Sequence, residues 1–61
     1  MNEKQILKMG SDAYMAGALI KENPFNKSKD GEAYNLWVEG YRDERDYWEK
    51  EAILSGRVLP L

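Results

Sequence analysis

The chain contains no cysteine and no histidine. Without cysteine it can form neither a disulfide nor a thiolate zinc site. Without either residue it also lacks the common pairs of nucleophile and base in which cysteine or histidine takes part. We therefore expect a protein with no enzymatic activity, no bound metal and no cofactor.

Long apolar runs are missing as well. No segment approaches the roughly 20 apolar residues that a membrane-spanning helix needs. The first residues, MNEKQILK, mix charged and apolar side chains and lack the basic-then-apolar order of a signal peptide. We expect a soluble cytoplasmic protein without a membrane partner.

The chain is also short, with 61 residues. A chain of this size forms one domain and buries only roughly 60% of the surface that it exposes when unfolded. Such a domain is marginally stable without disulfides, a metal or a partner. This size favours either self-association or docking onto a larger molecule.

Charge is unevenly distributed. Residues 1–29 hold five lysines against three acidic residues, whereas residues 30–61 hold four basic residues against eight acidic ones. Proteins that bind nucleic acid neutralise phosphates with clustered Lys and Arg. Direct nucleic-acid binding is therefore disfavoured, above all through the acidic second half.

The sequence of the first half of the chain predicts a helix over residues 3–21, approximately. Asn2 can cap it, with Gln5 in the matching position of a capping box. At about 100° per residue, small side chains fall at the centre of its apolar face and permit close approach of another helix. These small residues are Gly10, Ala13 and Gly17.

An Asn-Pro pair at positions 23–24 predicts the end of this helix, because a residue before proline avoids the helical conformation. A polar loop then spans about 22–30. Phe25 is a lone aromatic beside the turn, and we expect it to fold back onto the core.

A second helix is predicted over about 31–55, followed by an apolar tail at 56–61. Three of its aromatic residues, Tyr34, Trp37 and Tyr41, are expected to pack against the small residues of the first helix. The fold class is therefore all-α, an antiparallel two-helix hairpin with a longer second helix, either dimerised or docked on a partner. The last turns of the second helix should extend beyond the first.

Further residues of the second helix predict a surface for a partner. Leu36, Gly40, Tyr47 and Leu54 share one line, which we interpret as a dimer or partner interface, although isolated exposed apolar residues are also common. Trp48 is a further candidate for contact. Arg45 either anchors an anionic partner or lays its aliphatic stem along the apolar surface.

Six carboxylates of the second helix are spread around it and interleaved with basic residues: Glu39, Asp43, Glu44, Asp46, Glu49 and Glu51. Catalytic pairs and calcium loops need carboxylates that converge on one site. We interpret this run as a solvated face with charge pairs three or four residues apart.

The chain contains, in order, AYMAG at residues 13–17, NPF at 23–25 and WVEGYRDE at 37–44. An Ala-Gly pair, an Asn-Pro-aromatic piece and a Trp-x-x-Gly-aromatic piece in this order resemble the ribosome modulation factor family and its small bacterial and phage relatives. The resemblance implies a two-helix fold without enzymatic activity. For members of that family that share the activity after which it is named, the resemblance implies ribosome binding that pairs ribosomes into inactive dimers.

We therefore expect a non-catalytic binding module that modulates a larger assembly, and the resemblance suggests the ribosome as that assembly. Two other interpretations stay open. One is a phage-type inhibitor whose acidic helix occupies a basic site on a host protein. The other is a homodimeric structural accessory protein.

Overall fold

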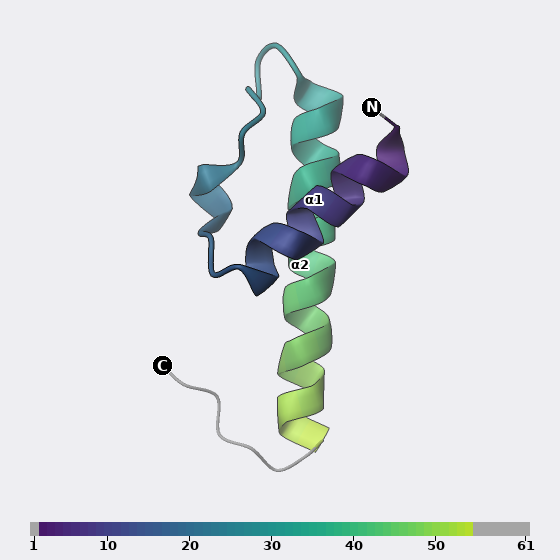
Figure 1. Cartoon of the computed structure of the whole chain (residues 1–61), viewed down its shortest axis with the longest axis vertical. Coiled ribbons are helices and arrows are strands. Elements are labelled where there is room, and N and C mark those ends of the chain that lie inside the picture. The colour runs from purple at the N-terminus through teal and green to yellow at the C-terminus, as the bar shows by residue number, and fades with distance from the viewer. Residues whose placement is uncertain (1, 55–61) are drawn as a thin grey trace.

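The computed structural model describes the backbone of residues 2–54 and the side chains of residues 2–52. A first helix, α1 (Glu3–Met15), is followed by a short 3-10 turn, η1 (Ile20–Glu22), and by a long second helix, α2 (Gly31–Leu54). α1 packs against α2, and the described residues contain no strand (Figure 1). The predicted all-α class, with a longer second helix, is confirmed.

The two helices cross obliquely and run in the same general direction (Figure 1). Glu3 and Ile6, near the start of α1, line one pocket together with residues from the start of α2. This arrangement corrects the antiparallel orientation in our prediction. The connecting residues 16–30 are long enough to carry the chain back, since an extended chain spans about 3.3 Å per residue and α1 is only about 20 Å long.

α1 begins at the predicted capping box. The Gln5 backbone nitrogen donates to Asn2 Oδ1 at 2.8 Å, and the Asn2 backbone nitrogen donates to Gln5 Oε1 at 3.2 Å. Both bonds satisfy amide groups that have no partner inside the helix. They fix the start of α1 at the residue that the sequence predicts.

α1 ends at Met15, well before the predicted end near residue 21. Gly17 adopts a φ of 85°, and its amide donates to the Tyr14 carbonyl while the Ala18 amide donates to the Ala13 carbonyl. These two bonds form a Schellman motif, which ends a helix at a left-handed glycine. Gly17 is therefore exposed at a helix end, and this corrects our prediction that it packs against the second helix.

Two glycines bring the helix backbones into contact where α1 crosses α2. A Cβ atom added to Gly10 would overlap the Trp37 carbonyl oxygen and lie 2.8 Å from the Tyr41 backbone nitrogen. A Cβ atom added to Gly40 would overlap the carbonyl oxygen of Leu7 in the same way. Glycine is the one residue type that leaves room for a second backbone at this crossing, because it has no Cβ atom.

The position of Gly40 corrects a second prediction. We expected Gly40 and Leu36 on an outer face of α2, but Gly40 is buried under α1 and Leu36 packs against the core. The physical reason is that α1 crosses directly over the smallest residue. The Ser11 hydroxyl also donates to the Gly40 carbonyl at 3.2 Å.

The core centres on Ile6, Trp37 and Tyr41, which are all buried. The Trp37 and Tyr41 rings stack with centroids 5.3 Å apart, and Tyr14 meets Tyr41 edge to face at 5.5 Å. Partly buried apolar residues surround this centre: Met9, Ala13, Tyr14, Ile20, Phe25, Ala33, Leu36 and Val38.

The connecting segment is tied to α2 by two hydrogen bonds. The Tyr41 hydroxyl donates to the Ala18 carbonyl at 2.8 Å, and Asn23 Nδ2 donates to the carbonyl of the partly buried Tyr34 at 3.1 Å. Phe25 lies against the core beside this second bond. These contacts hold residues 16–30 along one side of the crossing.

Candidate partner-binding site

α2 extends far beyond the point where α1 crosses it (Figure 1). Its 24 residues span about 36 Å, against about 20 Å for α1, at a rise of 1.5 Å per residue. On this extension Tyr47 is 54% exposed and Trp48 is 40% exposed. The long helix thus presents two large aromatic side chains that α1 does not cover.

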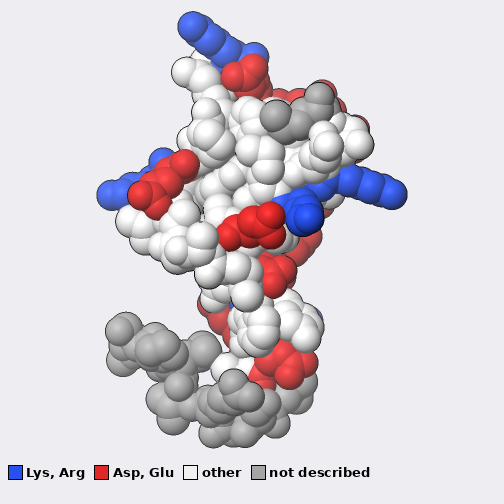
Figure 2. Space-filling view, viewed as in Figure 1, with Lys and Arg blue, Asp and Glu red and all other residues white. Residues whose placement is uncertain are grey.

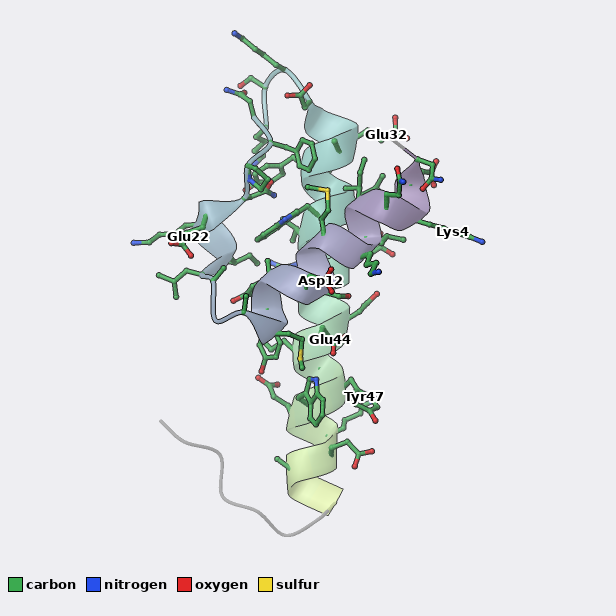
Figure 3. The ribbon with its side chains drawn as sticks, in the orientation of Figure 1. Lys4, Asp12, Glu22, Glu32, Glu44 and Tyr47 are labelled. Carbon is green, nitrogen blue, oxygen red and sulfur yellow. The ribbon has the colours of Figure 1, made fainter. Side chains whose placement is uncertain are left out.

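The two aromatic residues lie on the same side of α2 as its contact with α1. At about 100° per residue, three of the residues beyond the crossing fall within about 40° of the direction of Gly40, and a fourth, Trp48, lies about 80° away. These residues are Glu44, Tyr47, Trp48 and Glu51, and we call them the aromatic–acidic face. Figure 3 shows Glu44 and Tyr47 on the part of α2 that emerges below α1.

Two contacts order the centre of the aromatic–acidic face. The Tyr47 and Trp48 rings meet edge to face, with centroids 5.3 Å apart and an interplanar angle of 83°. Trp48 Nε1 donates to Glu44 Oε1 at 2.9 Å. The indole is therefore held on the surface, while the second oxygen of Glu44 keeps lone pairs that can accept from another donor.

The charges on this face have one sign. Arg42, Arg45 and Lys50 lie about 100° or more from its centre around the helix axis. Arg45 Nε is 3.8 Å from Asp46 Oδ1, an ion pair between adjacent positions rather than three or four residues apart. In Figure 2 uncharged side chains of this part of α2 are flanked by acidic ones.

The six residues predicted to bind a partner are thus placed in different surroundings. Tyr47 and Trp48 are exposed together on the extension, whereas Arg45 lies outside their face and pairs with Asp46. Gly40 contacts α1 instead, and Leu36 packs against the core. Leu54 is the last residue of α2, and its side chain lies outside the described residues.

Sequence reasoning missed Glu44 and Glu51 as members of this face. Their spacing was a usable signal, because residues three, four and seven positions apart share a side of a helix. Glu44 precedes Tyr47 by three positions, Trp48 by four and Glu51 by seven.

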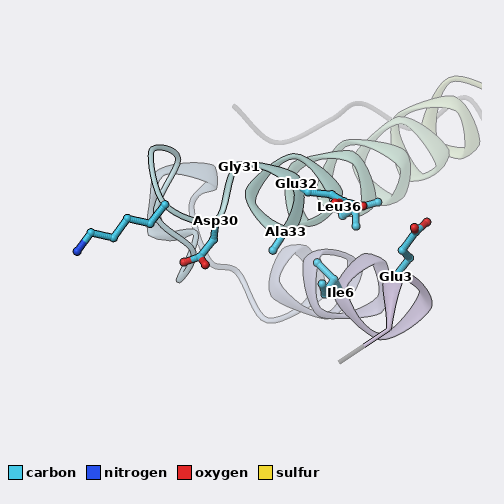
Figure 4. A pocket seen from close by; sticks show the side chains of 8 residues that line it. Glu3, Ile6, Asp30, Gly31, Glu32, Ala33 and Leu36 are labelled. Atoms are coloured by element: carbon cyan, nitrogen blue, oxygen red, sulfur yellow. The ribbon is translucent and has the colours of Figure 1, made fainter.

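A pocket of about 370 Å³ lies at the other end of the molecule, between the starts of α1 and α2 (Figure 4). Ile6, Ala33 and Leu36 supply its apolar lining, and Glu3 and Glu32 stand in the first turns of the two helices. Carboxylates at these positions stabilise the positive end of a helix dipole. This role in stability accounts for Glu3 and Glu32 at the pocket.

Among the described residues, no three acidic side chains are close enough to hold a metal ion together. Neither helix in the described part of the chain has the length and hydropathy needed to cross a membrane. Comparison with family models, with curated proteins and with solved structures gives no match to this chain.

Proposed function

We propose that this protein is a non-catalytic binding module that modulates a larger macromolecular assembly through the extension of α2. The observation that carries this proposal is the pair of exposed aromatic residues, Tyr47 and Trp48, fixed against each other beyond the crossing. Exposed tyrosine and tryptophan are typical anchors of protein interfaces. Trp37 and Tyr41, by contrast, are buried in the core of the protein itself.

The ribosome is the assembly that the resemblance to the ribosome modulation factor family suggests, and we place its action in the cytoplasm. Contact with ribosomal proteins suits this surface better than contact with ribosomal RNA, because the aromatic–acidic face carries carboxylates and phosphates would repel them. A basic surface on a ribosomal protein would attract it, because opposite charges are complementary across an interface.

Co-sedimentation with purified ribosomes tests this function. We expect the wild type to pellet with ribosomes and Tyr47→Asp to remain in the supernatant, since a charge would replace an anchoring ring. Asn35→Asp is the matched control, because Asn35 is exposed on α2 away from this face and gains the same charge. It should pellet like the wild type.

Two results would contradict the proposal. If the wild type stays in the supernatant, the ribosome is not the assembly. If Tyr47→Asp also captures the same proteins from lysate as the wild type, the extension of α2 is not the binding surface.

A second candidate is an inhibitor of phage type whose acidic helix occupies a basic site on a host protein. The absence of Lys and Arg from the aromatic–acidic face favours it. A homodimeric accessory protein is the third candidate, but pairing two copies across this face would bring like carboxylates together. Identification of captured proteins by mass spectrometry separates the host-protein target from the ribosome.

A further inference from the structure

The aromatic–acidic face combines two features that together specify the chemistry of a partner. Tyr47 and Trp48 offer exposed ring surface, and Glu44 and Glu51 place carboxylates beside the rings. An arginine side chain is complementary to both, because its planar guanidinium stacks on aromatic rings and forms paired hydrogen bonds with a carboxylate. A lysine provides the charge without the planar fork.

The spacing of the carboxylates also indicates how far apart the arginines of a partner should lie. Glu44 and Glu51 are seven positions apart on one side of α2, or two helical turns and about 10 Å along the axis. Two arginines seven positions apart on a second helix have the same separation. Apolar side chains between those arginines would meet Tyr47 and Trp48.

The Glu44 side chain is already ordered by a hydrogen bond in the free protein. Oε1 already accepts from Trp48 Nε1 at 2.9 Å, which restricts the carboxylate before a partner arrives. A side chain ordered in advance loses less conformational entropy on binding. The same bond holds the indole ring beside the remaining carboxylate oxygen.

We propose that the aromatic–acidic face binds a helical segment of a partner protein that carries two arginines two turns apart, with apolar residues between them. This inference rests on the proposed function, since it names the chemistry of the partner at the same surface. A second copy of the chain fits poorly, because Glu44 and Glu51 have no Lys or Arg on this face to meet across a twofold axis.

Titration with a designed peptide tests this inference. The probe is a synthetic amphipathic helix of leucine and alanine with two arginines seven positions apart beside the leucines. In one control peptide glutamine replaces both arginines, in a second lysine replaces them, and in a third the arginines stand on the opposite side. Fluorescence anisotropy of each end-labelled peptide measures its affinity for every variant. The NMR signal of each indole N–H locates the contact, because Trp48 is exposed and Trp37 is buried.

We expect the arginine peptide to shift the Trp48 signal and leave the Trp37 signal in place. Affinity should fall from the arginine to the lysine to the glutamine peptide, and the peptide with displaced arginines should bind no better than the glutamine one. Exposed ion pairs are modest, so Glu44→Gln/Glu51→Gln should weaken arginine-peptide binding by roughly fivefold. Trp48→Ala should weaken it by about tenfold or more, as loss of an interface anchor does.

Glu49→Gln is the matched control, since Glu49 is exposed at the same end of α2 but on the opposite side of the helix. It should leave arginine-peptide affinity within about twofold, as an exposed charge outside the contact would. Glu44→Gln keeps an oxygen that can accept from Trp48 Nε1, so the double variant removes charge without removing that bond. Circular dichroism of each variant should show unchanged helical content.

The outcomes separate this inference from the proposed function. If the arginine and glutamine peptides bind equally and Trp48→Ala weakens both, the surface is a docking site but the arginine preference is wrong. If no peptide shifts the Trp48 signal, the inference is overturned, while ribosome co-sedimentation still decides the proposed function. Dimerisation of the free protein that Trp48→Ala abolishes would assign the face to a second copy and also overturn it.

Discussion

At the scale of single residues, Tyr41 joins three parts of the protein. Its ring stacks on Trp37 within α2 and meets Tyr14 of α1 edge to face. Its hydroxyl donates to the carbonyl of Ala18 in the connecting segment at 2.8 Å. One side chain thus contributes apolar area to the core and satisfies a carbonyl just after the end of α1.

Replacing Tyr41 by phenylalanine separates these contributions, because the ring stays and the hydroxyl is lost. We expect the free energy of unfolding to fall by about 1 kcal/mol, the usual net value of an internal hydrogen bond. For a domain of this size that change lowers the melting temperature by about 4–8 °C. Thermal melting by circular dichroism measures it.

Tyr47→Phe is the control for this measurement, since Tyr47 is more than half exposed. Its melting temperature should match that of the wild type. Equal melting temperatures for Tyr41→Phe and the wild type would show that the bond to Ala18 contributes nothing to stability.

At the scale of elements, the contact between α1 and α2 depends on Gly10 and Gly40. Each faces backbone atoms of the other helix, so the two helices approach without intervening side chains. Such backbone contact brings Trp37 and Tyr41 against α1 and lets a short helix bury them. A helix of only 13 residues is marginal by itself in water, so this contact also stabilises α1.

Gly10→Ala should therefore destabilise the protein despite the better helix propensity of alanine. Alanine favours a helix interior over glycine by about 1 kcal/mol, but its methyl group would overlap the Trp37 carbonyl. Overpacking of a close contact typically costs about 1–3 kcal/mol. We expect a net loss of stability in urea unfolding followed by circular dichroism.

Gly31→Ala is the matched control, because nothing lies within 4 Å of a Cβ atom at Gly31. That variant should be as stable as the wild type or slightly more stable. Stabilisation by Gly10→Ala, as for an ordinary helix position, would contradict the backbone contact at the crossing.

At the scale of the whole molecule, charge separates the surface into regions. The first half of the chain has an excess of lysine, whereas α2 carries an excess of carboxylates, most of them exposed. The net charge is −2. A nucleic acid would be attracted weakly at one side and repelled along the length of α2.

We therefore expect no appreciable binding to bare ribosomal RNA at physiological salt, as measured by fluorescence anisotropy. A variant with Glu44, Glu49 and Glu51 all changed to Lys should gain weak binding that disappears at high salt, because counterion release drives such contacts. Sub-micromolar affinity of the wild type would contradict this expectation.

Much of the local structure could be predicted from the sequence. The capping box of Asn2 and Gln5 depends only on neighbouring residues, and the structure contains it. The end of α1 could not be predicted in this way, because the apolar spacing continues past Met15 into Ile20. Whether Gly17 extends the helix or ends it depends on the return of the chain, which places Ile20 and Phe25 on the core.

The candidate site was predicted in part for a related reason. Tyr47 and Trp48 follow from the length of α2, which exceeds anything that α1 can cover. The place of Gly40 depends on where α1 crosses, and helical periodicity alone leaves that choice open. The angle and direction of the crossing depend on the contacts of Gly10 with the Trp37 backbone and of Gly40 with the Leu7 backbone, long-range interactions that no local pattern specifies.

The contrasting surroundings of the two tryptophans give this protein two optical reporters. Trp37 is 2% exposed in the core, whereas Trp48 is 40% exposed on the extension of α2. Indole emission moves to longer wavelength in water, and only an accessible ring is quenched by a dissolved collider. Trp37 should therefore emit at shorter wavelength and report on unfolding, while Trp48 should emit at longer wavelength and report on whatever covers the end of the helix.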